Sequence, residues 1–188
     1  MTETPNPNIP DTDTITGEMH PIRRVVLSIG SNLGSRFESL QGAVNSLADT
    51  PEVWVTAVSP VYETEPVDAP EGSANFLNAV VLADTTLSAH TLLDRCLAVE
   101  DAFGRERTSP NAPRTLDVDL VVVGDRRSDS EELKLPHPKA AGRVFVLKPW
   151  FDVEPDAELL GVGPISDLIA ELGLDGVVLR EDLELTMQ

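Results

Sequence analysis

The chain has little cysteine, little positive charge and no long apolar run. Cys96 is the only cysteine in 188 residues, so no disulfide framework can form, which predicts a reducing, cytoplasmic location. No apolar run approaches the roughly 20 residues of a membrane span, and no basic segment followed by an apolar stretch marks a secretory signal. Lysine and arginine number 14 against 32 acidic residues, a net charge of −18. We therefore expect neither a nucleic acid nor a membrane as partner.

The few basic residues are concentrated in the middle of the chain. Nine of the fourteen fall between Arg95 and Arg143, where nine acidic residues balance them. Residues 1–22 hold four acids and no lysine or arginine, and residues 151–188 hold ten acids and one arginine. An acidic protein that binds an anion should gather its cations around the site. The middle of the chain is therefore where we expect such a site.

Length and composition predict one folded domain behind a disordered tail. Residues 1–21 are rich in Pro, Thr, Asn and Asp and have little to bury, which predicts an acidic, disordered segment. Residues 22–188 are long enough for a single domain, and a hydrophobic content of 41% is enough for a core.

Strand and helix patterns alternate along this domain. Two β–α–β passages, 25–58 and 76–123, predict an α+β or α/β sandwich in which helices pack on a sheet. Ser35 and Glu38 form a capping-box pattern at the start of the first helix. The apolar runs predict strands at residues 25–29, 53–58, 61–64, 76–83, 116–123, 133–135 and 177–179. The periodic segments predict helices from residue 35 to about 47, at 88–103, at 144–151 and at 165–172.

The strongest chemical signal is the Asp-Val-Asp sequence at the start of the 116–123 strand. Side chains alternate along a strand, so Asp117 and Asp119 share one face, with Cα atoms about 6.6–6.8 Å apart, while Leu116, Val118 and Leu120 take the other face. Two carboxylates so placed can bind one or two hard cations such as Mg²⁺. An ordinary solvated polar face is the alternative interpretation.

Three arginines lie just before this strand in the sequence. Arg105 and Arg107 precede it in a polar loop, and Arg114 is three residues before Asp117. Paired carboxylates for metal beside several guanidinium groups are what phosphoryl transfer requires. The arginines therefore favour a metal-dependent phosphate site over a solvated face.

Three other polar residues allow two interpretations each. Asn78, inside an apolar strand, is either a satisfied core amide or a group that reads the edge of a ligand. Glu100 lies in the last turn of a helix, where the dipole disfavours a carboxylate, so it is either exposed or compensated by cations such as Arg105. His137 lies between two prolines and is either a loop residue or, with Arg143 nearby, a phosphate donor or proton shuttle.

Taken in order, these pieces resemble a known family, the 6-hydroxymethyl-7,8-dihydropterin pyrophosphokinases. The resemblance runs from about Val25 to Pro155. Each motif is weak alone, but six in the right order at compatible spacing are specific. The motifs are Ile29 to Gly34, Tyr62 to Pro66, Phe76 to Ala79, Glu100 with Gly104-Arg105, Pro113 to Asp119, and Pro136-His137 with Arg143 and Phe145.

The resemblance implies a ferredoxin-like α+β sandwich, with helices packed on a mostly antiparallel sheet, and an activity in folate biosynthesis. The family transfers the β,γ-diphosphoryl group of ATP, the co-substrate, to the hydroxymethyl oxygen of a reduced pterin and leaves AMP. Two Mg²⁺ ions are expected, and we expect a monomer. The implied catalytic residues are Arg105, Arg114, Asp117 and Asp119, the two aspartates being the metal ligands. The implied pterin-binding residues are Thr64, Glu65, Val67, Phe76, Asn78 and Phe145. The implied nucleotide-binding residues are Glu100, Arg107, Leu120, His137 and Arg143.

The sequence departs from the family pattern at two places. The family often has a basic residue and then Trp-Gly before Pro-Arg, where this chain has Pro110, Asn111 and Ala112. The residue after the histidine is often aromatic, and here it is Pro138. These positions concern loop closure and nucleotide contacts and do not affect the metal or pterin residues.

Two other functions fit parts of the same pattern. A ferredoxin-like sandwich can be a regulatory small-molecule-binding module, but that function leaves the paired aspartates and the arginines unexplained. A Mg²⁺-dependent transferase acting on another alcohol is the second alternative. Phe76, Asn78 and Phe145, as a slot for a flat heterocycle, favour a pterin.

Overall fold

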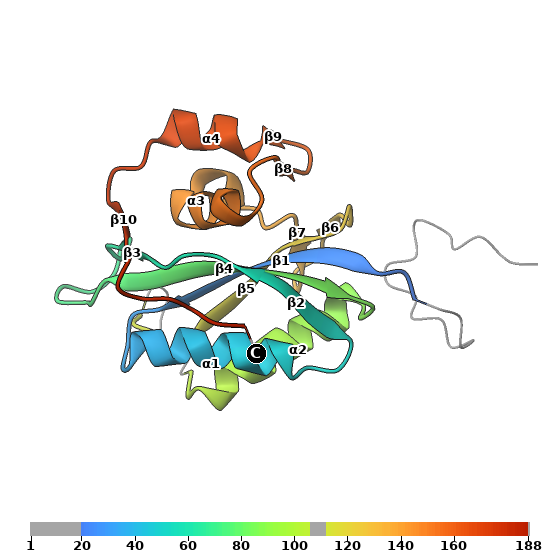
Figure 1. The fold of residues 1–188 in the computed structure, drawn as a ribbon, viewed down its shortest axis with the longest axis horizontal. Coiled ribbons are helices and arrows are strands. Elements are labelled where there is room, and N and C mark those ends of the chain that lie inside the picture. Colours follow the sequence, from blue (N-terminus) through green and yellow to red (C-terminus); the bar gives the residue numbers. More distant parts are fainter. Residues whose placement is uncertain (1–19, 106–111, 188) are drawn as a thin grey trace, which may run out of the picture.

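The computed structural model describes residues 20–105 and 112–187. Within them, one main sheet lies between two layers of helices (Figure 1). Its two longest strands, β1 and β4, pair antiparallel from Arg23–Thr85 to Ser31–Leu77, and each further pairing described is also antiparallel. The strands of this sheet are β1 (Arg23–Ser31), β2 (Val53–Val58), β3 (Tyr62–Thr64), β4 (Phe76–Thr85), β5 (Asp117–Val123) and β10 (Val177–Leu179).

The strand order confirms the predicted ferredoxin-like sandwich. β5 flanks β1, β1 flanks β4, and β2 and β3 follow one another along the far side of β4. Helix α1 (Arg36–Ala48) connects β1 to β2, and α2 (Ala89–Ala102) connects β4 to β5. Both helices lie on the same face of the sheet (Figure 1), so the chain forms two interleaved β–α–β units.

Both faces of the central strands are buried, which explains their almost uninterrupted apolar sequences. Val25, Leu27 and Ile29 of β1 pack with the apolar sides of α1 and α2. Val26 points to the other face and packs with Trp150 and its neighbours. That second face is covered by α3 (Val144–Val153), and α4 (Ile165–Leu172) packs on α3 (Figure 1). The short elements are β6 (Ser128–Asp129), β7 (Lys134–Leu135), η1 (Ala140–Gly142), β8 (Glu158–Leu159) and β9 (Gly163–Pro164).

The ends of the elements differ from the sequence prediction in two ways. β1 and β4 are longer than predicted, because cross-strand pairing extends from Arg23–Thr85 to Ser31–Leu77. Ser35 stands at the N-cap of α1, but its side chain forms no capping hydrogen bond, so the capping-box prediction is wrong. The α2 end is as predicted: Gly104 has φ +75°, which stops the helix at little steric cost.

The predicted tail lies almost entirely outside the described residues, since residues 1–19 are not among them. In the part of the chain that is described, no helix combines the length and the apolar character needed to cross a bilayer.

Candidate active site

Four strands place one residue each in a line across the sheet. Cross-strand pairing puts Tyr62 of β3 opposite Asn78 of β4, Asn78 opposite Gly30 of β1, and Gly30 opposite Asp117 of β5. Paired residues of antiparallel strands point to the same face. We call these four residues the cross-strand row. The row lies on the α3 face, because Val80, two residues after Asn78, packs in the cluster around Trp150.

Asp117 and Asp119 share this face, as predicted. The intervening residues Leu116, Val118 and Leu120 point the opposite way and are buried against α1 and α2. Burial, followed by the charge of Asp119, raises the pKa of Asp117, although Arg114 and Arg105 act in the opposite direction. The two carboxylates are therefore held close together in a partly dehydrated position, as a site for a cation requires.

Arg105 joins two carboxylates that come from different elements. Its Nη1 donates to Glu100 of α2 and to Asp117 of β5. Arg114 donates from Nη1 to the second oxygen of Asp117 at 3.0 Å. Glu100 is only 5% exposed, so the interpretation as an ordinary exposed glutamate is wrong and compensation by Arg105 is confirmed. Glu100 thus positions an arginine at the aspartate pair.

Asp119 differs from Asp117 in its partners. Within residues 20–105 and 112–187, no hydrogen bond or ion pair reaches its carboxylate. Burial raises the pKa of Asp119, against the lowering effects of Arg143, Arg105 and Arg114. A half-buried carboxylate that has no direct partner among the described residues loses part of its hydration, which costs folding free energy. That cost is reasonable at a site whose cation arrives with the substrate.

Asp119→Asn is expected to stabilise the ligand-free protein by about 0.5–2 kcal/mol at pH 7. A carboxyl whose folded pKa is raised contributes stability below its unfolded pKa, and this contribution is lost as the pH rises through the folded pKa. The amide carries no charge, so stability should fall less with rising pH in the variant than in the unaltered protein. Urea unfolding between pH 4 and 8 measures both curves. Asp117→Asn is the matched comparison, because it also loses the ion pairs to Arg105 and Arg114 and should not be stabilising. A less stable Asp119→Asn protein at pH 7 would contradict this assignment.

Two aromatic rings lie beside arginines on this face. The guanidinium of Arg114 is 5.8 Å from the ring centre of Phe76, and that of Arg143 is 5.6 Å from the ring centre of Phe145. Phe76 starts β4 and Phe145 lies in the first turn of α3. Cation–π contacts at these distances hold both arginines beside flat apolar surfaces.

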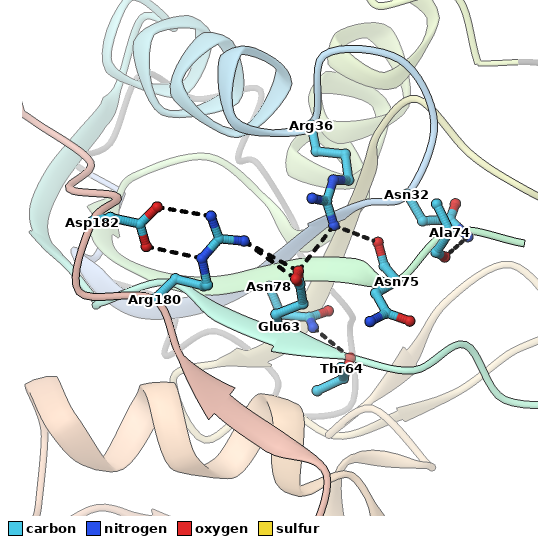
Figure 2. Close-up of polar contacts among 9 residues, drawn as sticks. All are labelled: Asn32, Arg36, Glu63, Thr64, Ala74, Asn75, Asn78, Arg180 and Asp182. Atoms are coloured by element: carbon cyan, nitrogen blue, oxygen red, sulfur yellow. Dashed lines mark hydrogen bonds and ion pairs between the residues drawn. The ribbon is translucent and has the colours of Figure 1, made fainter.

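Asn78 is a satisfied amide that also faces the site. Its Nδ2 donates to the hydroxyl of Thr64 at 2.8 Å (Figure 2). Glycine at position 30 provides the space: a Cβ there would lie 3.3 Å from Asn78 Oδ1 and 3.6 Å from the Phe76 ring. Asn78 can therefore be a satisfied core amide and also read the edge of a ligand.

His137 is placed beside β5 by its backbone. Its N–H donates to the Val121 carbonyl at 2.8 Å, and its Nδ1 accepts from the backbone N–H of Lys139 at 3.2 Å. Burial, followed by the charges of Arg143 and Lys139, lowers the pKa of His137. The neutral ring consequently carries its proton on Nε2, which can donate to an anion.

Two contributors to the site were not assigned a role from the sequence. The Asn32 side chain accepts from the Arg114 backbone N–H at 2.7 Å and donates to the Ala74 carbonyl at 3.3 Å, so it joins the two loops beside the site. The Tyr62 hydroxyl donates to Asp152 of α3, which ties that helix to β3. Asn32 lies in the Ile29 to Gly34 motif, but no periodic pattern in the sequence indicates which residues its side chain contacts.

Three of the predicted site residues in the described part of the chain are not joined to the others, namely Glu65, Val67 and the Leu120 side chain. Val67 is 71% exposed and Glu65 is also exposed. The Leu120 side chain is buried in the core on the opposite face, so only its backbone can face a nucleotide. Arg107 lies outside the described residues, as do Pro110 and Asn111.

The donor set fits a cation that is shared with a substrate. No group of three or more His, Cys, Asp or Glu suited to a metal occurs among the described residues. Mg²⁺ is commonly held by one or two carboxylates together with substrate phosphates and water, rather than by a complete protein cage. The Asp117 and Asp119 pair meets that requirement.

The sequence is similar to a family of known proteins. The family model for 7,8-dihydro-6-hydroxymethylpterin-pyrophosphokinase (HPPK) matches residues 26–155. A 2-amino-4-hydroxy-6-hydroxymethyldihydropteridine pyrophosphokinase of Pseudomonas aeruginosa is 36% identical over 156 residues, which cover 83% of this chain and 96% of that protein. A protein of the same name from Mycobacterium leprae is 44% identical over 163 residues, covering 79% of this chain and 83% of the other.

A solved structure has a similar fold. The HPPK-DHPS triple mutant of Plasmodium falciparum, crystallised with pteroate, matches with a TM-score of 0.63 at 14% identity. The match covers 84% of this chain and 44% of that longer chain, and at this identity it shows the fold alone. The extent of the family match and the two bacterial relatives lead to one conclusion: the chain belongs to the 7,8-dihydro-6-hydroxymethylpterin-pyrophosphokinase family.

Proposed function

We propose that this protein transfers the β,γ-diphosphoryl group of ATP to the hydroxymethyl group of 6-hydroxymethyl-7,8-dihydropterin. The hydroxymethyl oxygen loses its proton to solvent and forms a bond to the β-phosphorus, the bond from that phosphorus to the α,β-bridging oxygen breaks, and AMP leaves with that oxygen. The products are AMP and the pterin diphosphate, an intermediate of folate biosynthesis. The observation that carries the proposal is the presence, on one sheet face, of the aspartate pair, its arginines and an amide beside an aromatic ring.

The residues around Asp117 are suited to a triphosphate. Asp117 and Asp119 would hold Mg²⁺, two ions in this proposal, and the bound metal would neutralise charge on the phosphate oxygens. Arg105, Arg114 and Arg143 provide guanidinium groups from three separate segments, so they can contact an extended phosphate chain from several sides. His137 would donate its Nε2 proton to a phosphate oxygen. Arg107, Glu100 and the Leu120 backbone complete the proposed nucleotide set.

The residues around Asn78 are suited to a flat, polar heterocycle. Phe76 and Phe145 would stack on the ring, and Asn78 with Thr64 would read its hydrogen-bonding edge. Glu65 and Val67 would contribute from the following loop. A ring in that position lies beside Asp117 along the cross-strand row, so its hydroxymethyl group can reach the bound triphosphate.

Phe76→Ala is expected to weaken pterin binding about two- to tenfold, because loss of a stacking partner costs about 0.5–1.5 kcal/mol. ATP affinity should change by less than twofold, and Phe145→Ala should give the same pattern. Calorimetric titration with each ligand separately measures this difference. Phe151→Ala is a control, because Phe151 belongs to the same helix as Phe145 and stacks on Lys148 instead of a site arginine. An equal loss of both ligands in Phe76→Ala would indicate damage to the core and would contradict the stacking role.

The reaction itself is tested by its products. The protein incubated with ATP, Mg²⁺ and 6-hydroxymethyl-7,8-dihydropterin should give AMP and the pterin diphosphate in equal amounts, resolved by chromatography. Formation of ADP and a pterin monophosphate would refute attack at the β-phosphorus. ATP consumption that does not depend on the pterin would favour another acceptor alcohol. Ligand binding without turnover would favour a regulatory binding module.

We further propose that the protein is a monomer that acts in the cytoplasm. Its single buried cysteine is consistent with a reducing compartment.

A further inference from the structure

The C-terminal end of the chain lies against the sheet edge that carries part of the proposed pterin site. The family match ends at residue 155, yet β10 pairs with β3 in the register Val178–Glu63. Beyond β10, the chain crosses to α1, where Gln41 binds the backbone of Thr186 through both its amide nitrogen and its amide oxygen, each at 2.9 Å. Figure 1 shows this path. We call residues 177–187 the C-terminal strap.

A charged network connects the strap to the start of β4. Arg180 of the strap contacts both carboxylate oxygens of Glu63, at 3.2 and 3.1 Å. Arg36, the first residue of α1, donates from Nη1 to Glu63 at 3.3 Å and to the Asn75 carbonyl at 2.9 Å. Figure 2 shows the three side chains converging beside Asn75. A single carboxylate therefore holds two guanidinium groups from opposite ends of the chain.

The geometry of Arg180 is fixed from its other side. Its Nε and Nη2 donate to the two oxygens of Asp182 at 2.9 and 2.8 Å, a bidentate arrangement that orients the guanidinium plane. The side chains of Arg180 and Glu63 are 28% and 20% exposed. Water screens this pair less than it would screen a fully exposed ion pair.

The two ends of the network are adjacent to proposed pterin-binding residues. Glu63 immediately precedes Thr64, and Asn75 immediately precedes Phe76. Thr64 and Phe76 are also cross-strand partners. A shift of Glu63 or Asn75 is therefore transmitted through one peptide bond to a residue that would touch the ring.

We propose that Arg180 is a positioning residue for the pterin site, acting through Glu63, Arg36 and the Asn75 carbonyl on Thr64 and Phe76. The inference rests on the proposed function, and it assigns to the C-terminal strap a role in pterin affinity. Arg180 itself touches neither substrate.

The test is Arg180→Gln, with pterin and ATP affinities measured separately by calorimetry. Pterin affinity should fall about tenfold, because small displacements of positioning groups have effects of this size or larger, while ATP affinity changes by less than twofold. Hydrogen exchange of a peptide spanning residues 73–79 should be faster in the ligand-free variant. Glu63→Gln should reproduce both changes if Arg180→Gln does not fold well enough to be measured.

A control variant separates positioning from a general loosening of the strap. Gln41→Ala removes the contact of the strap with α1 and should keep pterin affinity within twofold. Asp182→Asn removes the partner that orients Arg180 and should weaken pterin binding in the same direction as Arg180→Gln. The inference is overturned if Arg180→Gln keeps normal pterin affinity, loses both ligands equally, or leaves exchange in 73–79 unchanged. It is also overturned if Gln41→Ala weakens the pterin as strongly as Arg180→Gln does. Absence of pterin binding by the unaltered protein would instead refute the proposed function, and this inference with it.

Discussion

Replacement of Asp119 by asparagine is expected to reduce turnover by about a thousandfold or more, while the protein remains folded. Loss of one group that stabilises transition-state charge typically costs a factor of about 10²–10³, and phosphoryl transfer depends strongly on such groups. The amide would also be a weaker metal ligand than the carboxylate. Asp117→Asn should have a similar effect. Steady-state AMP formation at saturating ATP and Mg²⁺ measures the loss.

The control for this experiment is an aspartate outside the site. The side chain of Asp129, in the β6–β7 hairpin, is 96% exposed. Its carboxylate lies 4.0 Å from the Lys134 Nζ, which is too far for a hydrogen bond. Asp129→Asn should keep turnover close to that of the unaltered protein. Activity above about a tenth of normal in folded Asp117→Asn or Asp119→Asn would rule out the metal-ligand role.

Arg105→Gln is expected to destabilise the protein by about 3–5 kcal/mol, the usual cost of removing one partner from a buried ion pair. The side chains of Arg105, Glu100 and Asp117 are only 17%, 6% and 16% exposed, so solvent compensates little for the lost charge. A domain of this size has a total stability of only about 5–15 kcal/mol, so the urea midpoint should fall markedly. Removal of Arg105 also removes one of the charges that lower the pKa of Asp117. The deficit should therefore shrink as the pH falls and Asp117 takes up a proton.

A second substitution tests the cause of this destabilisation. In the double variant Arg105→Gln/Glu100→Gln, the buried charge on α2 is neutralised, and a clear part of the lost stability should return. Urea unfolding of Arg105→Gln, Glu100→Gln and the double variant gives the coupling free energy between the two side chains. A loss below about 1 kcal/mol in Arg105→Gln, the value typical of exposed pairs, would show that the ion pairs are not structurally important.

The parts of this site that could be predicted from the sequence are those fixed by local periodicity. The common face of Asp117 and Asp119 follows from the alternation of side chains in any strand, whatever the strand packs against. The apolar faces of α1 and α2 follow from helical spacing in the same way. The ferredoxin-like order was available only through the family resemblance, because periodicity does not specify which strands pair.

The parts that could not be predicted depend on contacts between distant segments. From the sequence alone, Glu100 could be either exposed or buried, and only the packing of α2 against β5 shows which it is. Arg180 and Glu63 are 117 positions apart, and no spacing rule connects them. Ser35 has the right residue type for a cap, but its own backbone conformation, φ −81° and ψ 82°, differs from that of a usual N-cap, and its hydroxyl forms no capping hydrogen bond. In the first two cases the deciding factor is tertiary geometry, and in the third it is local backbone conformation.

The central claim is that nucleotide and pterin meet on the sheet face defined by the cross-strand row. A crystal structure of the protein with Mg²⁺, a non-hydrolysable ATP analogue and 6-hydroxymethyl-7,8-dihydropterin tests it most directly. The account predicts the pterin ring between Phe76 and Phe145, with Asn78 bonded to its polar edge. It also predicts Mg²⁺ on Asp117 and Asp119, with the β-phosphorus as the phosphorus atom nearest to the hydroxymethyl oxygen. A pterin bound away from Phe76 and Asn78, or a triphosphate whose metal does not touch the two aspartates, would contradict it.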